Sequence, residues 1–186
     1  MFTTRPEIAG TFGVVATTHW IASQVGMAVL ERGGNAFDAA VAAGFTLQVA
    51  EPHLNGPGGD APIIIHDAAS GAQHVICGQG VSPDAATSAK FAELGLDLVP
   101  GTGLLPAVVP GAFDAWALML RDWGTMELAD VLGYAIGYAR GGIHLVARIP
   151  AAIESMRPMF EQEWKTSAAV FLPGGKVPET GKLFAR

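Results

Sequence analysis

A glycine stop followed at once by an almost wholly apolar helix, between residues 30 and 50, constrains the fold more than any other feature of the chain. Leu30-Glu31-Arg32 closes one amphipathic segment on Gly33-Gly34, a pair that suits a helix C-terminus. Asn35 is a natural N-cap for the next helix, and Asp38 places a carboxylate near its N-terminus. That helix, predicted to run to about Val49, has almost no polar surface. It must be enclosed on all sides, so the fold needs layers on both faces.

Residue periodicity predicts strands and further helices elsewhere in the chain. β-Branched residues bounded by glycine predict a strand at 12–18, and helical spacing predicts a helix from about Ile21 to Arg32. Two apolar, β-rich runs at 61–67 and 72–77 predict a hairpin, whose continuous apolar strands favour a sheet covered on both faces. The remaining predictions are a short helix at 83–94, a loop at 95–103, helices at 112–123, 128–141 and 149–160, and a strand or loop at 168–172.

The composition indicates a globular chain without nucleic-acid-binding character. The 186 residues are 50% hydrophobic and 15% charged, which excludes a disordered tail and allows one domain with a real core. The net charge is −6, and no basic run occurs. Because a nucleic-acid surface needs clustered Lys and Arg, we expect no nucleic-acid role.

The sequence predicts a cytoplasmic location. The single cysteine, Cys77, rules out an internal disulfide framework and fits a reducing compartment. The first residues show no apolar segment after a basic start, so no secretory signal is expected. The most apolar run, 36–50, is shorter than the roughly 20 residues that a membrane helix needs, so we expect no membrane association.

No metal and no other cofactor is expected. The histidines are scattered, with no i,i+4 pair and no cysteine at ligand spacing. The run Gly56-Pro57-Gly58-Gly59-Asp60 follows a predicted helix and precedes a predicted strand, and it lacks the lysine of a phosphate loop. Its glycines leave two interpretations open, a tightly packed turn or a backbone surface that faces a ligand.

The residues by themselves show no catalytic centre. Cys77 ends an apolar strand, which favours a small buried residue over a nucleophile. Ser23, Ser82 and Ser88 have no G-x-S-x-G elbow around them. We therefore assign no catalytic residue within this chain.

Short motifs follow one another in a set order along almost the whole chain. The early ones are His19-Trp20-Ile21-Ala22-Ser23, Gly33-Gly34-Asn35-Ala36, Asp38-Ala39-Ala40-Val41-Ala42, Val49-Ala50-Glu51-Pro52 and Gly56-Pro57-Gly58-Gly59. The later ones are Ser82-Pro83-Asp84-Ala85-Ala86-Thr87, Val109-Pro110-Gly111, Ala135-Ile136-Gly137-Tyr138-Ala139-Arg140-Gly141-Gly142 and Phe171-Leu172-Pro173-Gly174-Gly175. Each motif is modest, but the ordered set is specific. In order and spacing it resembles the start of γ-glutamyltransferase-type proteins, from residue 12 to residue 186.

The resemblance implies an α+β fold, the N-terminal part of the αββα sandwich of N-terminal-nucleophile hydrolases. Such proteins are made as one precursor that cuts itself before a threonine. That threonine then attacks the acyl group, with its own α-amino group as base. Residues 1–186 would form the N-terminal portion of the large subunit. This would be an incomplete domain, with β-rich and helical layers to about residue 109 and mostly helices after it.

The resemblance also implies the partners. The nucleophile and most substrate contacts would lie in the small subunit, which begins with that threonine, so this chain would not be catalytic alone. The expected partners are this remainder of the precursor, a small amide substrate and further copies of the heterodimer.

Gln79 departs from the pattern of the γ-glutamyl-specific members. In those members an arginine before the Ser/Ala-Pro element holds the substrate α-carboxylate through a charge-assisted pairing. Alignment on Ser82-Pro83 places Gln79 at that position, where an amide brings a hydrogen bond but no charge. Gly59-Asp60 is also similar to the branch that includes oxamate-type amide hydrolases. We therefore expect a γ-glutamyltransferase-like amidohydrolase or acyltransferase that acts on a γ-glutamyl or related amide, with the acyl group left open. It is expected to bind substrate through Gln79 and to cleave γ-glutamyl anilides poorly.

The alternative is a non-catalytic αβ binding module, or a degenerate paralogue of the family. The mean hydropathy of +0.35 indicates apolar faces that a partner must cover, which favours a piece of a larger enzyme. A downstream reading frame that reaches a segment beginning with Thr would support the enzyme, whereas a stop after Arg186 would support the module.

Overall fold

The computed structural model describes residues 7–185 and divides into two compact units. The first, called here the helical unit, comprises the chain up to Gly56 and again from Leu120 onward. The second, the hairpin unit, comprises Pro57–Met119. Helices and strands are both present, which confirms the mixed α+β class.

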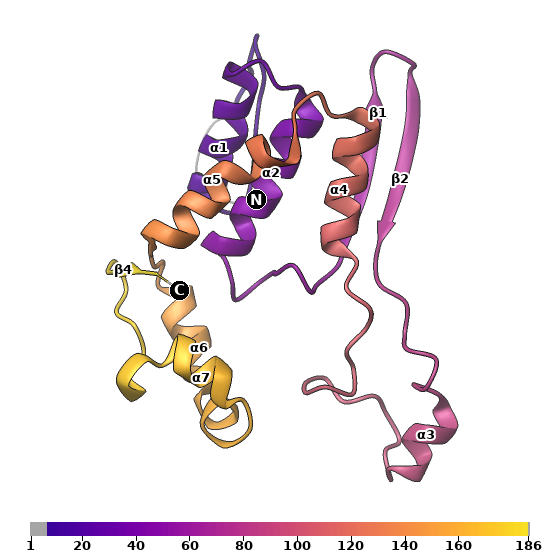
Figure 1. Cartoon of the computed structure of the whole chain (residues 1–186), viewed down its shortest axis with the longest axis vertical. Helices are drawn as coiled ribbons and strands as arrows, with labels where there is room; N and C mark the ends of the chain where they lie inside the picture. The colour runs from indigo at the N-terminus through magenta and orange to yellow at the C-terminus, as the bar shows by residue number, and fades with distance from the viewer. Residues whose placement is uncertain (1–6, 186) are drawn as a thin grey trace. The chain divides into compact units, whose positions relative to one another are not determined.

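The helical unit begins with the two helices that the sequence predicted, joined by a tight connection (Figure 1). α1 (Trp20–Glu31) ends at Gly33, whose φ of 92° lies in the left-handed region, and the Gly34 N–H donates to the Val29 carbonyl at 3.0 Å. α2 (Ala36–Ala50) begins at Asn35 with a capping box, in which Asn35 and Asp38 satisfy each other's backbone N–H groups. Both boundaries confirm the sequence prediction.

α2 is buried over most of its circumference, as its composition requires. Its buried side chains pack against α1 and against α5 (Leu128–Gly141). Val41 and Ala42 have no exposed surface, and Phe45 is only 4% exposed. The first core is the apolar contact of α2 with α1 and α5. Its burial contributes about 25 cal/mol for each Å² of apolar surface removed from water.

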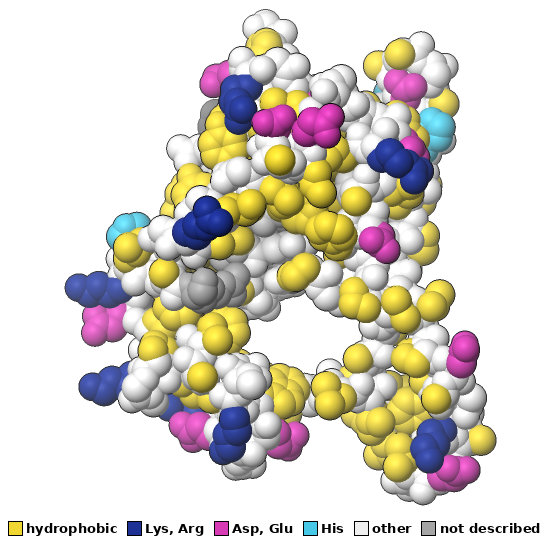
Figure 2. Space-filling view, in the orientation of Figure 1, with side chains coloured by type: hydrophobic (Ala, Val, Ile, Leu, Met, Phe, Trp, Pro, Cys, Tyr) yellow, Lys and Arg dark blue, Asp and Glu magenta, His cyan; other side chains and the backbone are white. Residues whose placement is uncertain are grey.

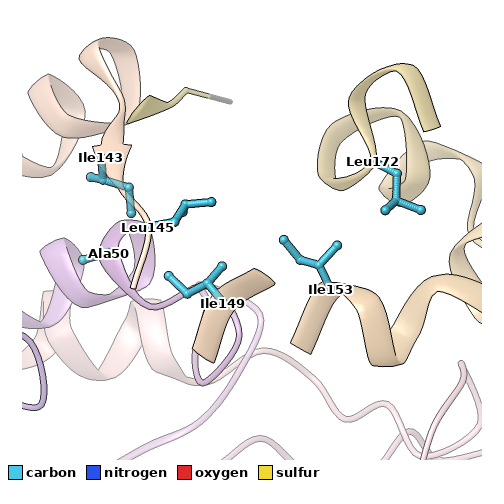
Figure 3. Close-up of a cluster of buried hydrophobic side chains, with 6 residues drawn as sticks. All are labelled: Ala50, Ile143, Leu145, Ile149, Ile153 and Leu172. Carbon is cyan, nitrogen blue, oxygen red and sulfur yellow. The ribbon is translucent and has the colours of Figure 1, made fainter. Parts of the chain in front are cut away.

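A second core lies at the far end of α2, where six buried side chains meet (Figure 3). They come from the end of α2, the short strand β3 (Ile143–His144), the turn after it, the helix α6 (Arg148–Gln162), and the residue that follows the helix α7 (Lys165–Phe171). Figure 3 shows Ile153 on α6 beside Leu172, and Ile149 one turn away toward Leu145. A 3₁₀ turn, η1 (Pro173–Gly175), follows α7, and β4 (Leu183–Phe184) pairs antiparallel with β3.

The hairpin unit contains the predicted antiparallel pair, β1 (Ala61–Asp67) and β2 (Ala72–Gly78). Ile65 and Ile76 are buried, but Ile64 and Val75 face each other across the ladder with 81% and 72% of their surface exposed. The expectation that both faces of this sheet are covered is therefore wrong for the described residues. Because side chains alternate along each strand, Ile65 and Ile76 face the buried side of the hairpin, whereas Ile64 and Val75 face solvent. In Figure 2, hydrophobic side chains also gather at the surface around α3 (Ser88–Glu93).

The predicted strand at 12–18 is not formed. These residues have no regular secondary structure, although their burial alternates along the segment. Val15 packs on α1, where a Cβ at Gly26 would lie 2.7 Å from its Cγ1, while Phe12 and Val14 are more than half exposed. A strand requires a neighbouring strand for its backbone hydrogen bonds, and no backbone pairing of this segment occurs within residues 7–185.

Two helix predictions also need correction. α3 begins at Ser88, because Thr87, rather than Ser82, accepts the capping hydrogen bond from the Lys90 N–H at 3.2 Å. Residues 168–172, predicted as a strand or loop, lie mostly in α7. In the helical conformation Ala168 and Phe171 pack against the second core. Tertiary packing therefore overrides the β preference of residues 168–172.

The helices predicted near 112, 128 and 149 are confirmed as α4 (Ala112–Trp123), α5 and α6. Across residues 7–185 the structure contains no helix with the length and hydrophobicity needed to cross a membrane.

Candidate functional site

Gln79, the predicted substrate-binding residue, lies directly after β2 in the hairpin unit. Its side chain is exposed, and its Oε1 lies 3.9 Å from the Sγ of Cys77. The amide thus lies at the surface with its oxygen beside the Cys77 thiol, while its backbone is held by the glycines on either side.

Close backbone packing fixes the segment that carries Gln79. A Cβ on Gly80 would lie 1.5 Å from the Val109 carbonyl oxygen, and one on Gly111 would lie 2.3 Å from the Gly78 carbonyl oxygen. The Val109 N–H donates to the Val81 carbonyl at 3.0 Å. Two backbone segments approach at a distance that only glycine permits, which sets the position from which Gln79 projects.

The glycine run 56–59 is packed at one residue and open at another. The Gly59 carbonyl accepts hydrogen bonds from the N–H groups of Gly111 and Ala112, at 3.2 and 3.0 Å, at the start of α4. This part of the bend is a packed turn. By contrast, a Cβ on Gly58 would meet nothing within 4 Å, so space remains beside it. The bend follows α2 and precedes β1, so no helix N-terminus follows these glycines directly.

Cys77 is exposed, which corrects the expectation of a buried cysteine. Because side chains alternate along β2, the buried Ile76 turns inward and Cys77 turns outward.

A buried polar cluster in the helical unit was not predicted from the sequence. His19 is 2% exposed and Glu51 is 7% exposed. The Thr18 hydroxyl donates to the Glu51 carboxylate and so joins the start of α1 to the end of α2. His53 lies close enough to act electrostatically on His19, and both of its ring nitrogens are buried without a hydrogen-bond partner among the described residues.

Electrostatics in this cluster disfavour a charged imidazole at His19. Burial lowers the pKa of His19 below its ordinary value, the Glu51 carboxylate raises it, and His53 lowers it again. No one residue type in the sequence signals this arrangement, because Thr18, His19, Glu51 and His53 meet only when α1 and α2 pack.

An apolar pocket of about 230 Å³ adjoins His53. The side chains around it are Pro52, Ile149, Ala152, Ile153, Met156, Phe160, Trp164 and Phe171. Several belong to the second core or pack against it, so the pocket is an opening in that core and carries no group for acid–base chemistry apart from the His53 ring.

Asp38 is the second buried polar centre of the helical unit. Besides the Asn35 N–H, its carboxylate accepts the N–H and hydroxyl of Thr125, at 2.9 and 2.7 Å, and the Met126 N–H at 3.1 Å. Burial would raise the pKa of Asp38, but these hydrogen bonds outweigh it and hold the pKa below its ordinary value. The sequence indicated the capping role of Asp38 but not its contact with a turn 87 residues away.

Across residues 7–185, His, Cys, Asp and Glu side chains form no group of three or more that is placed to hold a metal ion. Gln79, the residue that the sequence predicts to bind substrate, is an exposed position directly after β2.

The amino-acid sequence matches a known protein family. The family model of gamma-glutamyltranspeptidase matches residues 22–186. The chain belongs to the gamma-glutamyltranspeptidase family. The sequence resemblance is thereby confirmed.

Curated gamma-glutamyltranspeptidase relatives are longer than this chain and are named proenzymes. It is 35% identical to a glutathione hydrolase-like proenzyme of Bacillus subtilis (strain 168), over 97% of this chain and 34% of the relative. It is also 35% identical to the acylase ACY 1 proenzyme of Pseudomonas sp. (strain SE83), over 95% of this chain and 33% of the relative. The chain thus spans about a third of the length of the curated relatives it matches.

Two solved structures share the fold of this chain. LmbA2991 is 60% identical, with a TM-score of 0.95 over 100% of this chain and 32% of that protein. The gamma-glutamyltranspeptidase of Helicobacter pylori is 31% identical, with a TM-score of 0.89 over 97% of this chain and 52% of that chain.

Proposed function

We propose that this chain is the N-terminal part of the large subunit of a self-processing N-terminal-nucleophile amidohydrolase or acyltransferase. The nucleophile is a threonine on a segment that follows the residues described here. Self-cleavage would free its α-amino group to act as base. The role of residues 1–186 is to build part of an αββα sandwich and to present Gln79 to the substrate.

The observation that carries this proposal is the family match over residues 22–186, together with longer relatives that are named proenzymes of hydrolases and acylases. The chain's own chemistry supports it. Apolar residues such as Ile64 and Leu104, which are 81% and 84% exposed, offer apolar surface for a partner segment to cover. The proposed location of the protein is the cytoplasm.

The proposed substrate is a small amide whose acyl part lacks the amino-acid end of a γ-glutamyl group. A γ-glutamyl substrate presents an α-carboxylate, which is best bound by a bidentate arginine. Gln79 can donate one amide hydrogen bond there but supplies no positive charge. The side chain therefore suits a neutral or weakly polar acyl group better than a charged one.

Intact mass analysis of the full-length protein tests the proposal. We expect two chains whose masses sum to that of the precursor, with the smaller chain beginning at Thr. Replacement of that threonine by alanine should leave one uncut chain and no amidase activity. A wild-type protein that remains a single uncut chain would contradict the mechanism and would favour a non-catalytic module.

A further inference from the structure

The N-cap of α1 is a histidine, and its capping bond depends on the state of the ring. Nδ1 of His19 accepts a hydrogen bond from the Ile21 N–H at 3.2 Å. N-caps are usually Ser, Thr, Asp or Asn, whose oxygens can accept over most of the pH range. An imidazole nitrogen can accept only while it carries no proton. The bond therefore requires a neutral ring with its proton on Nε2.

The surroundings of His19 resist the addition of a second proton. Only 2% of the residue is exposed, and Nε2 is buried with no hydrogen-bond partner among the described residues. The ring also sits at the N-terminus of α1, where the backbone dipoles give a partial positive charge. A charged imidazole at this position would lose its bond to Ile21 and face that positive end.

Glu51 and His53 are the titratable groups that act on His19 within the described residues. The Glu51 carboxylate, at the C-cap of α2, favours an imidazolium, whereas the neighbouring His53 ring disfavours one. Glu51 also accepts the hydrogen bond from the Thr18 hydroxyl. The same carboxylate therefore contacts the residue before the His19 cap and acts electrostatically on the His19 ring.

We propose that His19 is a pH-sensitive cap, which holds the first turn of α1 while its ring is neutral and releases it when acid protonates Nδ1. The device is independent of where the nucleophile of the enzyme lies.

The direction of the effect follows from linkage. The pKa of His19 is lowered in the folded protein, because burial outweighs the attraction of Glu51. The contribution to stability is therefore complete above the unfolded value of about 6.5 and is lost as the pH falls toward the folded value. One proton changes the opening equilibrium by up to about tenfold per pH unit in that window.

Nitrogen NMR of the full-length protein, labelled with ¹⁵N-histidine, tests the ring directly. We expect His19 to show a bare Nδ1 and a protonated Nε2 at pH 7.5, and to titrate below 6.5. A protonated Nδ1 at that pH, or a midpoint at or above 6.5, would overturn the proposal. This measurement needs no variant, so it does not depend on whether a mutant folds.

Hydrogen exchange supplies the second readout. The protection factor of the Ile21 amide should fall by up to about tenfold per pH unit below 6.5. His19→Asn keeps an acceptor that does not titrate, and this slope should disappear. The matched control, His66→Asn, changes an exposed histidine of β1 and should leave the slope as in the wild type. A His19→Asn protein that retains the wild-type slope would contradict the proposal.

Glu51→Gln separates the electrostatic role from a merely structural one. The amide oxygen can still accept from Thr18, but the charge that favours an imidazolium is gone. The titration midpoint of His19 should then move to still lower pH. An unchanged or higher midpoint would show that Glu51 does not act on the ring as proposed.

Discussion

The carboxylate of Asp38, in the first turn of α2, accepts hydrogen bonds from both the backbone N–H and the hydroxyl of Thr125. A nearby contact, from the Asn35 side-chain amide to the Trp123 carbonyl at 2.7 Å, reinforces the same junction. The start of α2 is thus fixed to the turn between α4 and α5 by charge-assisted bonds, which are stronger than neutral ones.

Removal of the Asp38 carboxylate should be costly. Asp38→Ala leaves the N–H groups of Thr125 and Met126 without their acceptor and breaks the capping box. We expect the free energy of unfolding to fall by about 3 kcal/mol. Urea denaturation of the full-length protein at pH 7 measures this. Asp130→Ala, an exposed carboxylate in the first turn of α5, is the control and should cost under about 1 kcal/mol. An equal fall in the free energy of unfolding for the two variants would contradict this role of Asp38.

The contribution of Asp38 should depend on pH in a definite direction. Because its folded pKa is lowered, the stabilisation is complete above the ordinary value of 3.8 and is lost as the pH falls through the folded value. Thr125→Val removes one donor to the carboxylate and should cost about 1 kcal/mol at pH 7. Unfolding measured from pH 7 down to pH 3 should show this cost shrinking. A cost that grows in acid would contradict the assignment.

Backbone contact around Gln79 should tolerate no side chain at Gly80. A Cβ there would lie 1.5 Å from the Val109 carbonyl oxygen, so Gly80→Ala must push two backbone segments apart. We expect a loss of about 3 kcal/mol or more in unfolding free energy, and a lower kcat/KM because Gln79 is displaced. Gly101→Ala, where a Cβ would meet nothing within 4 Å, is the control and should change neither quantity appreciably.

A positive charge at residue 79 should change the choice of substrate. We expect the wild-type enzyme to hydrolyse γ-glutamyl anilides poorly and Gln79→Arg to raise kcat/KM for them by about tenfold or more, because arginine can pair with the substrate α-carboxylate. Gln73→Arg places the same charge on an exposed position of β2 and should have no such effect. Efficient glutathione turnover by the wild type would show that the alignment of Gln79 is wrong.

The second core should depend on Ile149. This side chain, in the first turn of α6, is 1% exposed and packs with Ile143 and Leu145 in the second core. Ile149→Ala should lower the unfolding free energy by about 2 to 5 kcal/mol, through lost burial and the cavity left behind. Val170→Ala, at a residue 42% exposed on α7, should cost far less. Thermal denaturation of both variants gives the comparison.

Local signals predicted those elements whose boundaries are set by local chemistry. Gly33-Gly34 and Asn35 fixed the α1–α2 boundary, because a left-handed glycine and a capping side chain act within a few residues. The hairpin and α4 to α6 followed from periodicity and turn residues.

Several failures depend on distant contacts, whereas the start of α3 and the exposure of Cys77 are set locally, by the Thr87 cap and by alternation along β2. Residues 12–18 carry a strand pattern but find no strand partner within the described residues. Residues 168–172 are helical because the second core takes up Ala168 and Phe171. The His19–Glu51 cluster and the Asp38–Thr125 contact join residues far apart in sequence, so no motif marks them. Gln79 came from family resemblance, and its role stays a prediction.

The interrupted layout of the helical unit has a consequence for synthesis on the ribosome. α1 and α2 emerge together and can form a helical pair early, but α5, which covers another side of α2, follows only after residues 51–127. At translation rates of about 5 to 20 residues per second, one apolar side of α2 waits on the order of 4 to 15 seconds for its cover. During that interval apolar surface of α2 is exposed to solvent in the nascent chain. Chaperone binding to α2 should therefore be strongest before α5 has left the exit tunnel.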